Sequence, residues 1–213
     1  MGAMDAVPLD WQRAYREGVT PWDLRGPTPA LLALLHGPVL VEAGVRSGAR
    51  VAVPGCGRGH DVRVFAQRGF DVTGFDIVPD AVEEARALLS LNRVRARVLC
   101  RDVLGLLPEF EGSFDLVYDY TCYCALRPYL RSSYARVLAG LLRPNGLVLH
   151  LAFPMRADAA GKDGRPPYLI TVTDLHESFD ACFALERELP AEDSVPERRG
   201  AERWYLWRKR REQ

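Results

Sequence analysis

Between residues 50 and 153, short apolar runs of strand length alternate with segments of helical periodicity. A repeated strand–helix–strand order is the βαβ unit, which implies a mainly parallel sheet with right-handed crossovers. The predicted strands are Arg50–Pro54, Phe70–Asp76, Ala96–Arg101, Ser113–Asp119 and Leu147–Phe153. The predicted helices between them are Asp61–Arg68, Pro79–Leu91 and Pro128–Leu142. The alternation therefore predicts an α/β protein with a Rossmann-like sheet.

Both ends of the chain depart from this alternation. Residues 1–48 are predicted to form a helical N-terminal cap, with helical segments over Trp11–Gly18 and Ala30–His36. Near the C-terminus we expect a helix and then an antiparallel edge of the sheet, over Thr173–Phe179, Phe183–Leu189 and Trp204–Arg208. A chain of 213 residues, 48% of them hydrophobic, matches one globular domain. We therefore predict a single domain over 1–213, with the α/β core at 49–213.

Charge and cysteine content narrow the classes of partner. The 28 basic and 28 acidic residues cancel, whereas nucleic-acid binders usually show a basic stripe. The one dense basic run, Arg208–Arg211, is interpreted as a solvated chain end. No apolar run reaches the ~18 residues that cross a bilayer, and five cysteines without framework spacing indicate free thiols. We expect a cytoplasmic monomer or weak dimer without nucleic-acid or membrane partners.

A glycine-rich loop follows the first predicted strand directly, in Pro54-Gly55-Cys56-Gly57-Arg58-Gly59-His60-Asp61. Glycine permits a sharp turn and lets a ligand approach the backbone closely. The N-terminus of the next helix then offers free N–H groups to polar ligand atoms. The spacing is not the G-x-G-x-x-G of dinucleotide enzymes, which disfavours an NAD(P)-dependent oxidoreductase. The tighter spacing suits a ligand without a pyrophosphate, such as S-adenosylmethionine (SAM).

Two aspartates follow the next two strands. Asp76 ends the second strand, 17 residues after Gly59, where an acidic side chain can accept hydrogen bonds from both ribose hydroxyls. The structural alternative is that Asp76 caps the helix that starts at Pro79. Asp102 follows the third strand, where a carboxylate can accept from the adenine amino group, or can serve as an ordinary loop aspartate. Together these features place three ligand-binding groups at one edge of the sheet.

At this point the chain resembles a known family. The glycine loop, Asp76, Phe114–Tyr120 and Arg165-Pro166-Pro167-Tyr168 look like the thiopurine S-methyltransferases, and most like the thiol and halide methyltransferases among them. The resemblance includes the N-terminal pattern Trp11-Gln12-x-x-Tyr15-x-x-Gly18-x-Thr20-Pro21-Trp22-Asp23. It spans roughly residues 10 to 208, which is nearly the whole chain.

The resemblance implies a role for each matching position. Trp11 and Trp22 would close the cap over SAM, and Asp76 would hold the ribose. The methionine part would lie against the glycines, the adenine near the third strand, and the sulfonium near the end of the fourth. The implied cofactor-binding set is Trp11, Trp22, Pro54, Gly55, Gly57, Gly59, Asp76, Ile77, Asp102, Val103, Asp119 and Tyr120. The implied catalytic set is Tyr168, which would face the methyl acceptor, with Tyr120 and Asp119.

The chemistry implied by the family needs few specialised groups. Methyl transfer from a sulfonium is an in-line displacement that depends on alignment and exclusion of water. A thiolate or halide needs no strong base, and the four histidines are scattered without a metal-ligand cluster, so no metal is predicted. Cys122-Tyr123-Cys124 is expected on a strand, with both thiols on one face as pocket lining rather than as catalysts. Arg165 departs from the glycine that relatives usually have, which bears on loop shape and acceptor size.

The sequence therefore predicts a SAM-dependent methyltransferase that acts on a small soft nucleophile such as a thiol, hydrosulfide, halide or thiopurine. The second product would be S-adenosylhomocysteine. One alternative is an O- or N-methyltransferase of a small metabolite, which would need a base in the pocket, with Tyr168 or Asp119 as candidates. Another is a SAM-binding module without catalysis.

Overall fold

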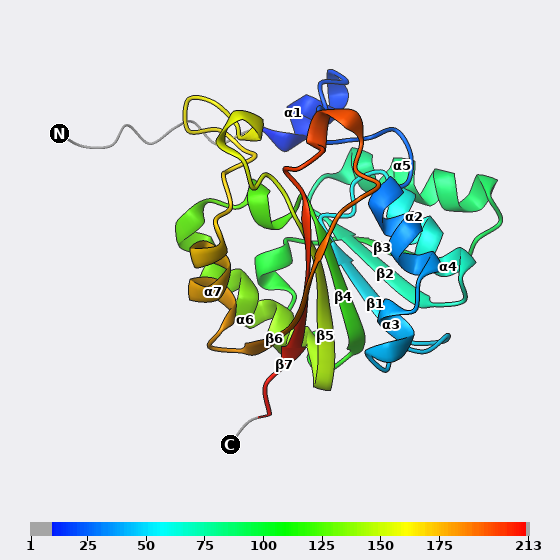
Figure 1. Cartoon of the computed structure of the whole chain (residues 1–213). Coiled ribbons are helices and arrows are strands. Elements are labelled where there is room, and N and C mark those ends of the chain that lie inside the picture. Colours follow the sequence, from blue (N-terminus) through cyan, green and yellow to red (C-terminus); the bar gives the residue numbers. More distant parts are fainter. Residues whose placement is uncertain (1–9, 212–213) are drawn as a thin grey trace.

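The computed structural model describes residues 10–211 and contains a seven-stranded sheet in the order β3-β2-β1-β4-β5-β7-β6 (Figure 1). Neighbouring strands from β3 to β5 are parallel, and β7 pairs antiparallel with both β5 and β6. The strands are β1 (Arg50–Pro54), β2 (Asp71–Asp76), β3 (Arg97–Cys100), β4 (Phe114–Tyr120), β5 (Leu142–Ala152), β6 (Phe183–Pro190) and β7 (Arg203–Lys209). The predicted α/β sheet with an antiparallel C-terminal edge is confirmed. The first nine residues of the predicted cap lie outside the described residues.

Helices cover both faces of the sheet. Figure 1 shows α6 and α7 on one side, α2 to α5 on the other, and α1 at one end of the sheet. The helices are α1 (Trp11–Arg16), α2 (Pro29–His36), α3 (Val39–Glu42), α4 (His60–Gln67), α5 (Pro79–Leu91), α6 (Arg131–Leu141) and α7 (Val172–Phe179). None of the helices described between residues 10 and 211 has the length and apolar composition needed to cross a bilayer.

The alternation of side chains along the strands builds a separate core on each face. Val51 and Val53 pack in the cluster that contains the buried residues of α2, α4 and α5. Ala52 points the opposite way and packs in the cluster with α6 and α7. Successive residues of a strand face opposite sides, so a run that is apolar throughout is buried on both faces. This is why the central strands read as continuous apolar runs in the sequence.

The structure differs from the predicted elements in three places. The short helix α3 (Val39–Glu42) was not predicted, because four residues are too few for a periodic pattern. Strand β5 begins at Leu142, the last residue of the predicted helix, rather than at Leu147, and its register against β4 shifts. The prediction that Cys122-Tyr123-Cys124 lies on a strand is wrong. Strand β4 ends at Tyr120, Thr121 has a φ of 63°, and Tyr123–Ala125 forms a 3₁₀ turn.

The C-terminal basic run is tied to the fold at several points. The guanidinium of Arg208 donates to the carbonyl oxygens of Ala43 (2.9 Å) and Asn145 (2.8 Å). Lys209 Nζ donates to the carbonyl of Leu142 at 2.8 Å. Arg210 Nε donates to the carbonyl of Asp180 at 2.8 Å. These side chains hold the edge of the sheet to neighbouring turns, so the run is more than the solvated chain end that was predicted.

Candidate functional site

The glycine loop after β1 is packed so closely that side chains would not fit at its turns. Gly55, Gly57 and Gly59 have φ values of 60°, 51° and 76°, in the left-handed region that favours glycine. A Cβ on Gly57 would lie 3.0 Å from the hydroxyl of Tyr15, and a Cβ on Gly55 would lie 2.9 Å from Cys122 Cβ. The loop therefore leaves bare backbone beside the space that opens in front of it.

Asp76, at the end of β2, holds this loop in place. Its Oδ2 accepts from the N–H of Gly57 at 2.8 Å, and its Oδ1 accepts from the N–H of Val78 at 2.9 Å. Burial raises the pKa of the carboxyl, and the two N–H donors oppose that shift. Each oxygen keeps a second lone pair, so Asp76 can support the start of α5 and also accept from a ligand. The N-cap of α5 is Val78 and has no side-chain cap, so Asp76 holds the turn before the helix and keeps lone pairs for a ribose.

A cavity of about 950 Å³ opens at this edge of the sheet. Its walls come from the ends of β1, β2, β3 and β4 and from the N-terminal segment. Of the positions predicted from the sequence, the following line it: Trp11, Trp22, Gly55, Gly57, Asp76, Ile77, Asp102, Val103 and Tyr120. Asp102 Oδ1 also accepts from the N–H of Leu104 at 2.9 Å and caps a 3₁₀ turn. Groups from successive strand ends therefore meet in one space, as expected for ligand sites of open α/β sheets.

Four predicted positions are not among the residues that line the cavity: Pro54, Gly59, Asp119 and Tyr168. Pro54 is a buried residue of β1. Gly59 is the N-cap of α4, and a Cβ there would lie 2.8 Å from Ala85 Cβ. The close packing of α4 against α5 at Ala85 therefore explains why this position is a glycine.

Asp119 neighbours Tyr120 on β4 and therefore faces the other side of the sheet. It is 1% exposed and accepts from the hydroxyl of Tyr134 at 2.6 Å and from the N–H of Tyr123 at 3.3 Å. His150 Nε2 lies 3.6 Å away. Burial raises the pKa of Asp119 to about 6 and lowers the pKa of His150 to about 3. The catalytic and cofactor-binding roles predicted for Asp119 have no support in this position.

The raised pKa of Asp119 predicts a pH-dependent stability. A buried carboxyl whose pKa rises from 3.8 to about 6 binds more protons folded than unfolded in that interval, so wild-type stability falls as pH rises through it. Asp119→Asn keeps an acceptor for Tyr134 and removes the titration. It should gain on the order of 2 kcal/mol relative to wild type between pH 4 and pH 7. Urea unfolding at both pH values measures this difference. Asp71→Asn, at an exposed position of β2, should show no such gain.

The Pro-Pro-Tyr segment reaches the cavity through residues other than its tyrosine. Arg165, Pro166 and Pro167 line the cavity, whereas Tyr168 does not. The N–H of Tyr168 donates to the carbonyl of Cys124 at 2.8 Å, and its carbonyl accepts from Arg131 Nη2 at 3.2 Å. The backbone of Tyr168 is therefore held against the turn beyond β4. The predicted role of Tyr168 toward the methyl acceptor stays a prediction.

The N-terminal segment covers the cavity through an aromatic cluster. The rings of Trp11 and Trp22 meet edge to face at 5.1 Å, and Trp22 Nε1 donates to the hydroxyl of Tyr15 at 3.4 Å. Arg58, from the glycine loop, lies over the Tyr15 ring at 4.9 Å and donates to Asp23 Oδ2 at 2.5 Å. The guanidinium and the carboxylate are 21% and 10% exposed. Arg58 thus joins the loop to the cover.

Replacing Arg58 by glutamine should loosen this cover. The partly buried ion pair with Asp23 is worth about 1 kcal/mol, so the dissociation constant of SAM should rise about five-fold. Intrinsic tryptophan fluorescence during titration with SAM, to which Trp11 and Trp22 on the cavity wall contribute, measures the change. Arg63→Gln is the matched control, since Arg63 lies on the following helix and contacts Asn92 instead. Equal weakening in both variants would contradict a specific role for Arg58.

The far end of the cavity contains a buried cation that the sequence analysis missed. Arg198 is 6% exposed, lines the cavity, and donates to the hydroxyl oxygen of Tyr120 and to the carbonyl of Trp22 (2.9 Å). Its guanidinium lies over the rings of Phe153 (4.7 Å) and Tyr120 (5.4 Å). The hydroxyl of Tyr120 donates in turn to Glu202. Arg198 ends a three-residue 3₁₀ helix, Pro196–Arg198, which is too short for a periodic pattern to mark it.

Cysteine side chains place polarisable sulfur atoms along the cavity wall. Cys122 and Cys124 line the cavity together with Cys56 near the glycine loop, and all five cysteines of the chain are unpaired. Burial raises the pKa of Cys124 to about 12 and that of Cys122 well above its usual range. Both groups therefore stay as thiols, which supports the predicted role as lining. Among residues 10–211, no cluster of His, Cys, Asp and Glu could hold a metal ion.

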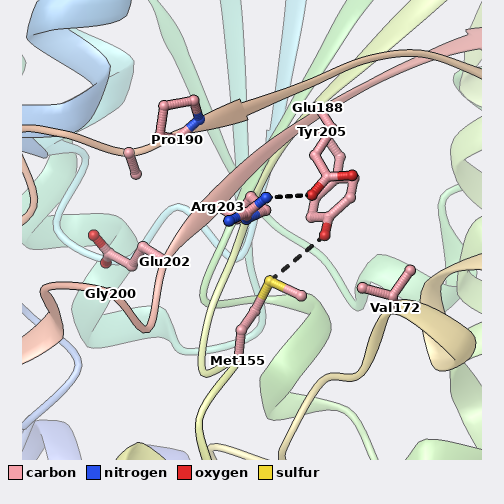
Figure 2. A pocket seen from close by; sticks show the side chains of 9 residues that line it. Met155, Val172, Glu188, Pro190, Gly200, Glu202, Arg203 and Tyr205 are labelled. Atoms are coloured by element: carbon pink, nitrogen blue, oxygen red, sulfur yellow. Dashed lines mark hydrogen bonds and ion pairs between the residues drawn. The ribbon is translucent and has the colours of Figure 1, made fainter.

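A second, smaller pocket of about 350 Å³ lies beside β6 and β7. Figure 2 shows Glu202 beside Gly200 on its wall, with Arg203, Glu188, Tyr205 and Met155. Arg203 Nη1 pairs with Glu188 Oε1 at 2.5 Å. Glu202 therefore borders this pocket while its carboxylate accepts from Tyr120, which lines the larger cavity.

Comparison with known proteins identifies the family. The family model described as thiopurine S-methyltransferase matches residues 7–210. A probable thiol methyltransferase 2 of Arabidopsis thaliana is 34% identical, over 93% of this chain and 84% of its own length. A thiocyanate methyltransferase 1 of Brassica oleracea is 30% identical, over 93% and 84%.

A solved structure shares the fold. It is the 1,6-didemethyltoxoflavin-N1-methyltransferase of Burkholderia thailandensis with bound 1,6-didemethyltoxoflavin and S-adenosylhomocysteine. The TM-score is 0.75 at 22% identity, over 99% of this chain and 94% of that one. The family model and the relatives confirm three predictions: the family, the use of SAM, and methyl transfer to a small soft nucleophile. This chain belongs to the thiopurine S-methyltransferase family and is a SAM-dependent methyltransferase.

Proposed function

We propose that this enzyme methylates the sulfur of a small thiol, or a comparable soft anion, held at the end of the cavity formed by Tyr120, Phe153 and Arg198. The observation that supports this most is the buried guanidinium of Arg198, which is 6% exposed on the cavity wall. A buried cation attracts an anionic acceptor strongly, because little water screens it. The names of the relatives, a thiol and a thiocyanate methyltransferase, agree with this acceptor class.

The residues at the other end of the cavity fit SAM. Asp76 would accept from the ribose hydroxyls, Asp102 and Val103 would border the adenine, and the bare backbone of Gly55 and Gly57 would lie against the methionine part. Trp11 and Trp22 would exclude water above it. When bound, SAM supplies a methyl group on a positively charged sulfur, which aromatic faces such as those of Tyr120 and Phe153 attract. The chain's own contribution is then alignment of the acceptor and shielding from water.

An acceptor panel tests the proposal. The purified protein is incubated with SAM and with an aromatic thiol, hydrosulfide, thiocyanate, iodide, a phenol or an amine, and S-adenosylhomocysteine is quantified. We expect turnover with the sulfur acceptors and iodide and none with the phenol or amine. Turnover confined to the phenol or amine would assign an O- or N-methyltransferase instead. SAM binding without turnover of any acceptor would contradict the proposal.

We also propose that the chain works in the cytoplasm, as one domain and as a monomer or weak dimer, on a small-molecule acceptor rather than on nucleic acid. The five unpaired cysteines support a reducing compartment. The zero formal net charge supports a small-molecule acceptor, because a polyanion would need a basic surface. Sedimentation of the purified protein over a range of concentrations tests the oligomeric state.

A further inference from the structure

Two openings of the molecule are joined by a single tyrosine. Tyr120, the last residue of β4, lines the large cavity, and its hydroxyl donates to a carboxylate oxygen of Glu202. Glu202 directly precedes β7, is 7% exposed, and borders the smaller pocket shown in Figure 2. The acceptor end of the cavity is therefore connected, through the hydrogen bond of Tyr120, to a residue of the smaller pocket's wall.

Arg198 fixes the direction of this link. Its Nη1 donates to the oxygen of Tyr120, so that oxygen accepts from the guanidinium and its proton is directed at Glu202. A phenol oxygen has two lone pairs, and one remains free to accept from a group in the cavity. Burial raises the pKa of Tyr120 far above its usual range, so the residue stays a phenol and can only pass a proton on.

A thiol that binds in its neutral form, unlike the thiolate that Arg198 would attract, releases one proton during methylation. The thiol must lose its proton as the carbon–sulfur bond forms, so a group beside the acceptor has to take that proton up. Most other carboxylates of the wall have local partners. Asp23 pairs with Arg58, and Asp10 and Glu17 both accept from Arg13. Asp76 accepts from two backbone N–H groups, Asp102 caps a 3₁₀ turn, and Asp61 accepts from Thr28 and Tyr118. Glu197 is exposed on the wall next to Arg198 and is the rival proton acceptor.

We propose that Tyr120 and Glu202 form a proton relay that takes the proton of a neutral thiol acceptor from the cavity to the smaller pocket. The inference rests on the proposed function. As the acceptor sulfur bonds to the methyl carbon and the sulfonium carbon–sulfur bond breaks, the S–H proton passes to Tyr120 Oη. The phenolic proton of Tyr120 passes to Glu202, and Glu202 then releases it to water in the smaller pocket. The products are the methyl thioether, S-adenosylhomocysteine and one proton.

If the relay operates, a variant that cannot take up the proton should lose kcat with a protonated acceptor but not with an acceptor that has no proton. Thiocyanate and iodide have no proton to lose, whereas an alkyl thiol at neutral pH is protonated. Glu202→Gln keeps an oxygen that accepts from Tyr120 but cannot take up the proton. We expect its kcat with the alkyl thiol to fall about 100-fold, within the usual range for loss of general acid–base catalysis. The kcat with thiocyanate should stay within about two-fold. Glu188→Gln, the other acid of the smaller pocket, is the matched control and should leave both rates unchanged.

Two further measurements keep the test decisive. Tyr120→Phe removes the relay hydroxyl and also changes the wall of the acceptor site, so both rates should fall, but kcat with the alkyl thiol should fall about 100-fold more than kcat with thiocyanate. This extra loss decides the matter if Glu202→Gln does not fold. Wild-type enzyme should show a solvent deuterium isotope effect on kcat with the alkyl thiol and none with thiocyanate. Equal losses for both acceptors, no loss for either, or a thiol-specific loss in Glu197→Gln alone would overturn the relay. If wild type methylates neither acceptor, the proposed function fails instead.

Discussion

Replacing Asp76 by alanine should weaken SAM binding by about 10- to 100-fold, the largest effect expected on the cofactor side. The substitution removes an acceptor for the ribose hydroxyls, and hydrogen bonds to a charged group are worth about 1.5–3 kcal/mol. It also removes the acceptor that holds the N–H of Gly57 at 2.8 Å, so the glycine loop loses its anchor. Calorimetric titration with SAM and with S-adenosylhomocysteine measures both affinities.

Two controls separate ligand binding from loop support. Asp76→Asn keeps an oxygen for one N–H, but its amide cannot accept from two hydroxyls, so most of the loss should remain. Asp71→Ala, at the exposed start of the same strand, should bind SAM as wild type does. If Asp76→Ala bound SAM with unchanged affinity, Asp76 would not belong to the site.

Replacing Arg198 by methionine should lower kcat/KM for a soft anionic acceptor by about 100-fold or more. When one member of a buried, hydrogen-bonded pair of charges is removed, the binding free energy falls by about 2–5 kcal/mol. Part of this cost arises because the remaining charge stays buried without its partner. Here Glu202, at 7% exposure, loses the cation closest to its hydrogen-bonded partner Tyr120, so the melting temperature should fall as well. The affinity for SAM should change less, because Asp76 and the glycine loop stay in place, although Arg198 also donates to the carbonyl of Trp22 at 2.9 Å.

Steady-state kinetics with thiocyanate measure the loss of kcat/KM, and calorimetry measures the affinity for SAM, so the effect on the acceptor is separated from any effect on the cofactor. Arg199→Gln is the neighbouring control, since Arg199 is exposed and does not line the cavity. Arg198→Lys retains the charge but cannot bridge Tyr120 and Trp22 as the guanidinium does, so it should restore part of the rate. Unchanged kinetics in Arg198→Met would contradict the proposed acceptor site.

The cofactor end of the site could be predicted from the sequence because each of its groups follows a strand. Gly57, Asp76 and Asp102 come after three successive apolar runs, and parallel strands end at the same edge of a sheet. The identity of the strands followed from their apolar composition, and α5 was predicted with its observed bounds, Pro79–Leu91, because a proline and a helical period mark it.

The acceptor end could be predicted only in part, for two physical reasons. Arg198 and Glu202 lie in or beside an irregular segment, and tertiary packing alone brings them to Tyr120. Asp119 and Tyr120 were both predicted at the site, but adjacent residues of a strand face opposite sides, so a single strand end directs only one of them at the cavity. Tyr168 follows two prolines in a segment without regular secondary structure. No periodic pattern there indicates where its side chain points.

The central claim is that successive strand ends form one SAM site whose far end, at Tyr120 and Arg198, holds the acceptor. A crystal structure of the complex with S-adenosylhomocysteine tests it most directly. We predict that the ribose hydroxyls lie within hydrogen-bonding distance of the Asp76 carboxylate and that the sulfur lies nearer to Tyr120 than to Asp102. A ligand whose ribose lies away from Asp76, or that occupies the smaller pocket between Glu188 and Glu202, would contradict the account.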